Sequence, residues 1–198
     1  MILGLDPSSV ATGWAVGPPG SVPVFGTYKP PRAADTADYG PFLDGTRTFL
    51  SEMITRHRVT HVHFEQPFMP RPGIKWVRNK KTGRMTPVAV IESNIHTLRK
   101  LYAVTGVIEL ICGDHNVDCS ETNIGKWRSW FFTRDQDGKK PRGKPALKAA
   151  AIAQCRVCGW DVQNDNEADA CGIWAHACWC IAKTTPTALA GELFEGAA

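Results

Sequence analysis

Three carboxylates occupy positions where they could hold a divalent cation. Asp6 follows an apolar run at the start of the chain, and Glu65 ends the alternating segment 60–65. Asp169 lies in a later segment with helical periodicity. A carboxylate in apolar surroundings is costly to desolvate unless a cation compensates for it, and carboxylate oxygens are ligands that suit Mg²⁺ and Mn²⁺. Convergence of the three side chains would create such a metal site.

The start of the last helical segment offers further oxygen ligands. Asn166 and Asp165 precede Asp169 by three and four residues and share its helix face, whereas Glu167 points largely away from it. Glu167, or less readily Asp165, could replace Asn166 as a ligand if the helix start is distorted. The alternative is that Asp165 and Asn166 only cap the helix, while Asp6 belongs to an ordinary turn.

Two blocks without acidic residues hold 11 of the 23 lysines and arginines. The first block, residues 66–85, contains Arg71, Lys75, Arg78, Lys80, Lys81 and Arg84. The second, residues 138–149, contains Lys139, Lys140, Arg142, Lys144 and Lys148. Such blocks are either solvated loops or surfaces that bind phosphates, and Phe68 and Trp76 add rings that can stack on unpaired bases.

Periodicity and turn signals place the elements that must position these side chains. Strands are predicted at 1–5, 12–17, 22–28 and 60–65, with another at 107–111 or 116–119. Helices are predicted at 44–57, 88–104, 124–132 (capped by Asn123), 146–158 and 166–181. The basic block 66–85, rich in Pro and Gly, is predicted to be a loop. This order of elements indicates an α/β domain around a mixed sheet.

Composition sets the broad class. A chain of 198 residues with 43% apolar residues can bury a core as one domain. It has no apolar run near the roughly 20 residues of a membrane span, so no membrane association is expected. Seven cysteines without a secretory signal fit reduced thiols inside a cell. Cys155 and Cys158 have a zinc-knuckle spacing, but no second pair follows at a familiar distance, so buried thiols are the preferred interpretation.

Three motifs together resemble those of RuvC-type Holliday junction resolvases. The first comprises Gly-Leu-Asp-Pro-Ser-Ser at 4–9 and Thr-Gly-Trp-Ala at 12–15; the second is His-Phe-Glu-Gln-Pro at 63–67; the third is Asn-Glu-Ala-Asp-Ala at 166–170. The resemblance spans about residues 2–181, with phage-encoded members as the nearest expected relatives. It implies an RNase H-like fold, in which an antiparallel opening meander continues into parallel strands flanked by helices. The nuclease domain would then cover 1–182, followed by a tail at 183–198.

The resemblance also implies a function. Members act as homodimers that cut two strands of a four-way DNA junction symmetrically, here in a bacterial cytoplasm. Asp6, Glu65 and Asp169 would ligate metal, together with Asn166, at a position that many members fill with an acid or His. Two Mg²⁺ or Mn²⁺ ions per site would activate a water and stabilise the leaving oxygen. The basic blocks and Phe68 would contact the junction, and the helix 88–104, with its wide apolar stripe, is the predicted dimer interface.

Other functions remain compatible with the same residues. A different RNase H-like nuclease, acting on flaps, forks or RNA–DNA hybrids, would use the same acids. A non-catalytic junction-binding module could have lost its metal because Asn166 carries no charge. An ATPase of the related actin-type fold is disfavoured, because the phosphate-binding glycine pattern is missing and the chain is short for two lobes.

Overall fold

The computed structural model describes residues 1–31, 39–67, 72–91, 95–132 and 141–185. Its centre is a five-stranded sheet in the order β3-β2-β1-β4-β7. The strands are β1 (Ile2–Asp6), β2 (Thr12–Gly17), β3 (Val24–Tyr28), β4 (His61–Glu65) and β7 (Asp118–Thr122). The pairs β1–β2 and β2–β3 are antiparallel, whereas β1–β4 and β4–β7 are parallel. The predicted mixed sheet, an antiparallel meander followed by parallel strands, is thus confirmed.

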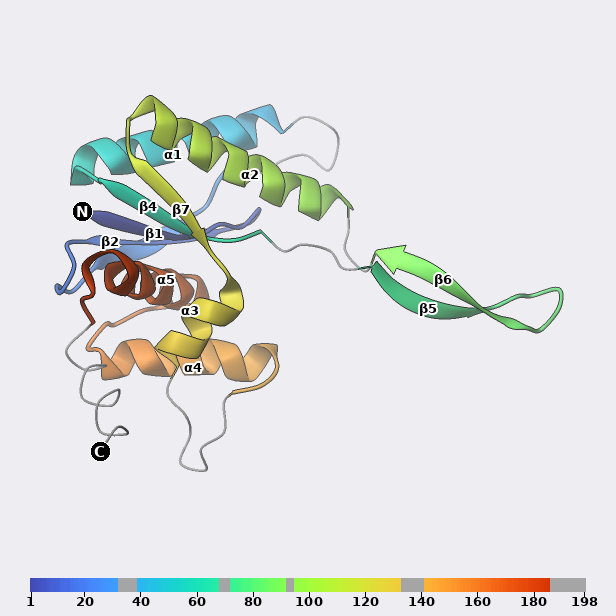
Figure 1. Ribbon diagram of the computed structural model, residues 1–198. Helices are drawn as coiled ribbons and strands as arrows, with labels where there is room; N and C mark the ends of the chain where they lie inside the picture. The colour runs from blue at the N-terminus through green and yellow to red at the C-terminus, as the bar shows by residue number, and fades with distance from the viewer. Residues whose placement is uncertain (32–38, 68–71, 92–94, 133–140, 186–198) are drawn as a thin grey trace.

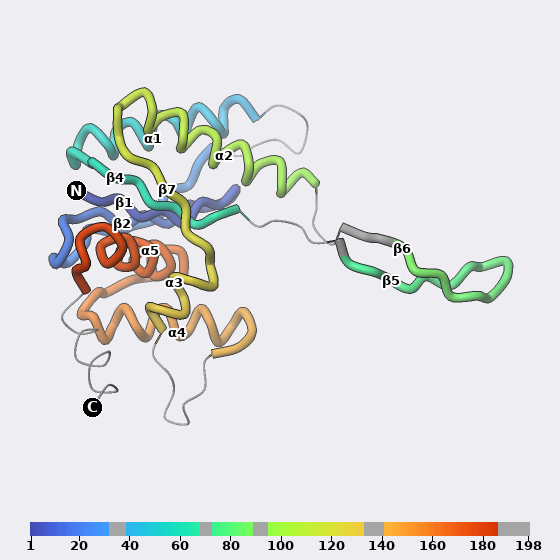
Figure 2. Tube along the Cα trace, in the orientation of Figure 1, coloured from blue at the N-terminus to red at the C-terminus, as the bar shows by residue number. Residues whose placement is uncertain are grey.

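Helices cover both faces of this sheet. On one face lie α1 (Gly40–His57) and α2 (Ile95–Asp114), and on the other lies α5 (Asp165–Ala182), with α3 (Ile124–Phe131) and α4 (Lys144–Val157) beyond it (Figures 1 and 2). Each face has its own apolar core, one of which contains Leu3, Phe42 and Ile108 and the other Trp127, Cys155 and Trp174. Burial on both faces explains why β1 is almost continuously apolar.

Two glycines allow α5 to lie directly on the sheet. A Cβ added to Gly4 in β1 would come within 2.6 Å of the backbone nitrogen of Trp174. A Cβ on Gly13 in β2 would overlap the carbonyl oxygen of Asn166. Any larger residue at either position would push the helix away. The close approach sets the height of α5 above the carboxyl end of β1.

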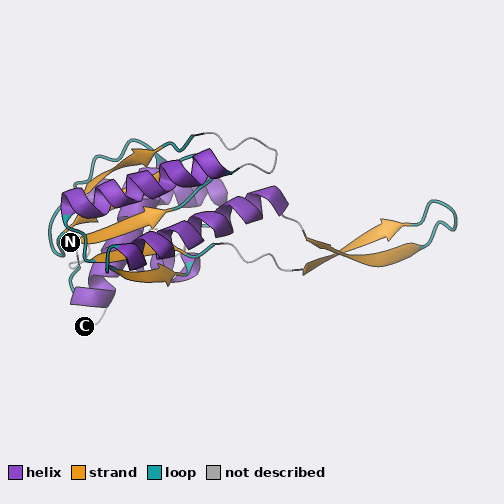
Figure 3. Cartoon of the chain, turned by 90° about the horizontal axis from the view of Figure 1, so that it is seen from above, coloured by secondary structure: helices purple, strands orange, loops and turns teal. Residues whose placement is uncertain are grey.

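A second sheet consists only of β5 (Pro72–Arg78) and β6 (Met85–Ile91), which pair as an antiparallel hairpin that projects away from the body (Figures 1 and 3). The prediction of a loop at 66–85 was therefore wrong for residues 72–78 in β5 and for residue 85, where β6 begins. The helix predicted at 88–104 was also wrong at its start, because residues 88–91 belong to β6 and α2 begins only at Ile95. This segment favours a strand because it contains the β-branched residues Val88, Val90 and Ile91. Pairing with β5 then satisfies the backbone hydrogen bonds of the strand.

The remaining elements follow the predictions closely. The cap at Asn123 is confirmed, since its side chain accepts from the backbone nitrogen of Gly125 over 2.9 Å. Of the two strands proposed after α2, the one near 116–119 is present as β7, whereas 107–111 lies inside α2. Among the helices in the described residues, none is both long and apolar enough to cross a membrane.

Candidate active site

Asp6, Glu65 and Asp169 come together at one edge of the sheet. The parallel neighbours β1 and β4 pair Leu5 with Phe64, so the next residues of the two strands, Asp6 and Glu65, extend from the same edge. Asp169 lies one turn into α5, the helix that packs on β1 and β2 through the glycines at 4 and 13. The residues singled out from the sequence are therefore neighbours in space, although 163 positions separate the first from the last.

The electrostatics of the three carboxylates reflect their crowding. The pKa of Asp6 is raised well above its ordinary value by burial first, and then by the negative charges of Glu65 and Asp169. Burial also raises the pKa of Glu65 and that of Asp169. Clustered carboxylates in a partly desolvated setting are unfavourable unless a cation is near. The site therefore needs positive charge.

Helix α3 supplies polar partners to two of the three carboxylates. The indole nitrogen of Trp127 donates to Glu65 Oε2 over 2.8 Å, and Arg128 Nη2 donates to Asp169 Oδ2 over 2.8 Å. The Arg128 guanidinium lies 5.0 Å from the centre of the Trp127 ring. Its charge lowers the pKa of Asp6, Glu65 and Asp169 against the effect of burial. Arg128 is thus a cation shared by the whole cluster.

Sequence reasoning missed both of these residues. Trp127 is fully buried, yet its indole nitrogen also holds a carboxylate. Arg128 was not singled out at all. Their position follows from the sheet: β7 runs parallel to β4 and pairs Thr122 with Glu65, so the helix that follows begins beside the carboxylates.

The donor set suits a hard divalent cation. Asp169 Oδ1 is buried and has no hydrogen-bond partner, which leaves an oxygen in need of a cation or donor. Carboxylate oxygens match the preferences of Mg²⁺ and Mn²⁺. Within the described ranges, no three His, Cys, Asp or Glu side chains are already arranged around a common ion position. A metal ion could bind at the unpartnered Oδ1, where it would compete with the charge of Arg128 on Oδ2 of the same carboxylate.

The polar residues at the start of α5 make different contacts. The N-cap is Asn164, whose side chain accepts from the backbone nitrogen of Glu167 over 3.0 Å. The suggestion that Asn166 caps the helix was therefore wrong. Glu167 accepts from the Gln163 backbone nitrogen at 2.8 Å and from the Thr27 hydroxyl at 3.2 Å. These contacts favour a role for Glu167 in stabilising the helix start rather than as a substitute ligand.

Two further residues of the predicted site lie close to the carboxylates. Lys148 Nζ forms an ion pair with Asp165 Oδ2 at 2.5 Å, and its charge also lowers the pKa of Asp169. Lys148 lies on the first two turns of α4, where Lys144 and Arg142 are exposed nearby in the chain. Part of the second basic block therefore borders the carboxylate cluster.

The first basic block lies elsewhere. Lys75, Arg78, Lys80, Lys81 and Arg84 are exposed on the β5–β6 hairpin. The predicted DNA contacts Phe68, Arg71, Lys139 and Lys140 lie outside the described residues.

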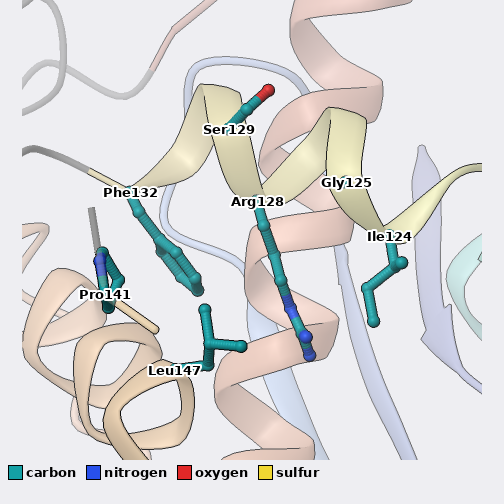
Figure 4. Close-up of a pocket in the computed structure, with 7 residues that line it drawn as sticks. All are labelled: Ile124, Gly125, Arg128, Ser129, Phe132, Pro141 and Leu147. Atoms are coloured by element: carbon teal, nitrogen blue, oxygen red, sulfur yellow. The ribbon is translucent and has the colours of Figure 1, made fainter. Parts of the chain in front are cut away.

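An apolar pocket of about 300 Å³ adjoins the cluster between α3 and α4 (Figure 4). Its lining consists of Ile124, Gly125, Arg128, Ser129, Phe132, Pro141 and Leu147. The Arg128 side chain extends from α3 along this pocket (Figure 4), and its end reaches Asp169. Arg128 therefore both lines the pocket and contacts the carboxylate cluster.

Comparison with known proteins gives matches in structure only. No family model and no curated protein sequence matches the chain. A solved structure of Thermus thermophilus RuvC in complex with a Holliday junction substrate matches with a TM-score of 0.59 and 12% identity, covering 93% of this chain and 98% of that one. A second Thermus thermophilus RuvC structure matches with a TM-score of 0.57 and 13% identity, over the same shares. The chain therefore has the RNase H-like fold seen in RuvC.

Proposed function

We propose that the protein is a divalent-metal-dependent endonuclease that hydrolyses phosphodiesters in Holliday junctions and related branched DNA. The observation that carries this proposal is the convergence of Asp6, Glu65 and Asp169 at one sheet edge, bordered by basic residues. The fold supports it, because a RuvC of similar fold has been solved with a Holliday junction substrate. The three sequence motifs support it independently, since they supply these same carboxylates.

In this proposal Asp6, Glu65 and Asp169 hold two Mg²⁺ or Mn²⁺ ions, with Asn166 as a neutral ligand. Metal held by these residues would supply the charge that activates a water and stabilises the leaving oxygen. Trp127 fixes the orientation of Glu65 through its indole N–H, as outer-shell partners of metal ligands commonly do. Arg128 neutralises the cluster without metal and is placed to turn toward a DNA phosphate once Asp169 is engaged elsewhere.

The basic blocks would bind the DNA backbone on either side of the carboxylates. Lys148 on α4 borders the site, Lys144 and Arg142 are exposed a few residues before it, and Lys139 and Lys140 belong to the same block of sequence. The hairpin lysines and arginines, with Phe68 and Arg71 before them, would contact DNA further away. These contacts are non-specific in sequence and weaken as salt is raised.

Symmetric cutting requires two active sites, so we propose a homodimer. Helix α2 exposes Ile95, Tyr102 and Leu110, which provides apolar surface for an interface. Sedimentation at micromolar concentration tests this directly, and a monomer both with and without DNA would contradict it. As a DNA-processing enzyme, the dimer would act in the cytoplasm of a bacterial cell.

A cleavage panel tests the proposed activity. A mobile four-way junction, a flap, a fork, an RNA–DNA hybrid and a linear duplex are incubated with the protein, with and without Mg²⁺. Metal-dependent paired nicks in the junction, with 5′-phosphate and 3′-hydroxyl ends, are expected. Preferential cutting of flaps, forks or hybrids would instead identify a different nuclease of this fold.

A second candidate is a junction-binding module without catalysis. Arg128 favours it, because an arginine already occupies the charge-compensating position on Asp169. Tight junction binding with no cleavage in either Mg²⁺ or Mn²⁺ would establish this alternative.

A further inference from the structure

Cys112 and Cys119 lie on either side of the short turn that joins α2 to β7. Cys112 belongs to the last turn of α2, and Cys119 is the second residue of β7. The backbone nitrogen of Val117 donates to the carbonyl oxygen of Cys112 over 2.8 Å, and Asn116 adopts a left-handed φ of 53°. The chain therefore reverses within a few residues, and β7 runs back beneath α2 (Figure 1).

The register of the sheet directs the Cys119 side chain toward the helix. Cys119 is paired with Val62 of β4, whose side chain belongs to the apolar core beneath α1 and α2. Paired residues of neighbouring strands point to the same face of a sheet, and Cys112 belongs to that same core. The Cys112 thiol donates a hydrogen bond to the Cys119 sulfur. The two sulfur atoms are therefore already neighbours.

The two thiols differ in exposure and in acidity. Cys112 is buried, whereas Cys119 is exposed on the edge strand of the main sheet. The hydrogen bond from Cys112 lowers the pKa of Cys119, and the same hydrogen bond, together with burial, raises the pKa of Cys112. A solvent-accessible, acidic thiol beside a second thiol is the arrangement typical of redox-active cysteines.

We propose that Cys119 and Cys112 form a reversible disulfide, in which Cys119 reacts with a hydroperoxide and Cys112 resolves the product. The Cys119 thiolate attacks one oxygen of hydrogen peroxide, the O–O bond breaks, and the departing hydroxide takes up the Cys119 proton as water. The Cys112 sulfur then attacks the resulting sulfenic acid, the S–O bond breaks, and the second hydroxide leaves with the Cys112 proton. Two thiols are oxidised and one peroxide is reduced to two waters.

Other cysteines of the chain lack one of these two properties. Cys155 and Cys171 also form a hydrogen-bonded pair, but both are 0% exposed, so a peroxide cannot reach them. Cys180 is exposed, but its sulfur lies 3.7 Å from His176 Nε2, and burial raises its pKa. Exposure and a neighbouring thiol thus coincide at Cys119.

Peptide mapping of the full-length protein tests the disulfide directly. The reduced protein is treated with hydrogen peroxide, its free thiols are blocked, and it is digested with a protease that cuts before Asp. Cuts before Asp114 and Asp118 place the two cysteines on separate peptides. We expect these peptides to remain linked until a thiol reductant is added. Cys119→Ser, at an exposed position, should abolish the link, whereas the matched Cys180→Ser should leave it unchanged.

The order of the two steps has its own readouts. Cys112→Ala should leave the oxidised Cys119 as a sulfenic acid that dimedone traps. With limiting iodoacetamide at pH 7, wild-type Cys119 should be labelled faster than Cys180, by about 3-fold for each unit of pKa difference, because its larger thiolate fraction outweighs its lower intrinsic nucleophilicity. Cys112→Ala should reduce this advantage, since the hydrogen bond that lowers the pKa of Cys119 is lost.

The disulfide would fasten the end of α2 to an edge strand of the main sheet. A cross-link limits the conformations of the unfolded chain, so oxidation should raise the urea midpoint of the wild type, and a thiol reductant should reverse the shift. Cys119→Ser should show no such shift. A midpoint that does not rise once the link has formed would contradict this fastening of the two elements.

Several outcomes would overturn the proposal. A disulfide between two chains, or one that includes Cys180, would assign the reactivity of Cys119 to another partner. Conversion of wild-type Cys119 to a sulfinic acid without any link to Cys112 would show that Cys112 does not resolve it. The proposed nuclease fails separately: a wild type that never cleaves DNA but forms the Cys112–Cys119 link retains this inference, and a cleaving enzyme without the link refutes it.

Discussion

Arg128 and Asp169 form a 2.8 Å ion pair inside the cluster of three carboxylates that defines the candidate site. Both side chains are largely shielded from solvent, at 22% and 12% exposure. Two buried atoms of the pair, Asp169 Oδ1 and Arg128 Nε, nevertheless have no hydrogen-bond partner. One atom of each side chain is therefore available for a new ligand. The pair therefore places a cation of the protein against a carboxylate that would also hold a divalent ion, so Arg128 and the ion would compete for Asp169.

Removing the Arg128 side chain should have opposite effects on metal binding and on DNA cleavage. Arg128→Gln should strengthen Mn²⁺ binding in the absence of DNA, because a cation competing for Asp169 is lost. Junction cleavage at saturating metal should fall by about 10- to 100-fold, as for loss of an outer-shell partner. Isothermal titration with Mn²⁺ measures the first effect and single-turnover cleavage the second. Arg128→Lys keeps the charge and serves as control, and weaker Mn²⁺ binding in Arg128→Gln would contradict this account.

Neutralising each carboxylate should abolish cleavage and preserve binding. Asp6→Asn, Glu65→Gln and Asp169→Asn each remove a charged ligand, so turnover should fall by more than the roughly 100-fold typical of outer-shell changes. Junction affinity in EDTA should stay within a few-fold of wild type. Asp44→Asn, at an exposed acid of α1 paired with Arg47, should leave both measurements unchanged. Near-normal turnover in any of the three variants would remove that residue from the site.

Asn166 can be tested against its neighbour Asn164. If Asn166 is a neutral ligand, Asn166→Asp should lower the Mg²⁺ concentration for half-maximal rate and Asn166→Ala should raise it, with partial rescue by Mn²⁺. Stability should change little in Asn166→Ala, because the N-cap is Asn164. Asn164→Ala should instead cost about 1 kcal/mol in the free energy of unfolding. Mg²⁺ titrations that are identical for wild type and both Asn166 variants would exclude Asn166 as a ligand.

Two buried histidines predict a loss of stability in mild acid. Burial and the nearby His176 lower the pKa of His63 from 6.5 to about 4, and burial also lowers the pKa of His176. Between pH 6.5 and 4 the unfolded chain takes up protons at these positions that the folded protein does not. The contribution of the two histidines to stability should therefore fall as the pH is lowered through this window, by at most about 1.4 kcal/mol per unit of pKa difference. The raised pKa values of Asp6, Glu65 and Asp169 act in the opposite direction, so the effect is read from the comparison with a histidine variant.

Urea unfolding at pH 7 and pH 5 measures this effect. His63→Gln removes one titrating group and can still bond Ser120, the 2.7 Å partner of His63 Nδ1. It should lower the free energy of unfolding by more at pH 7 than at pH 5, because the protonation penalty of His63 is lost in the variant. An unchanged pH dependence in His63→Gln would show that other groups control the acid response.

Local patterns were enough to predict the opening strands and the cap at Asn123, and they singled out Asp6, Glu65 and Asp169, which the structure brings together. Strand alternation, helical periodicity and capping depend on residues within a few positions of one another, so they can be read along the chain. The same patterns gave the mixed sheet, which the structure confirms. Asp6 and Glu65 could be selected because each lies at the end of a predicted strand.

Only the tertiary structure decided which side chains meet those carboxylates and what the basic block becomes. Trp127 and Arg128 reach Glu65 and Asp169 because β7 pairs beside β4 and starts α3 at the same edge, a contact across 41 to 62 positions. The segment 72–91 becomes a hairpin because two runs satisfy each other's backbone hydrogen bonds across the turn at Asn79–Gly83. Neither effect can be predicted from composition and spacing, because both depend on pairing between segments and not on the residues of one segment alone.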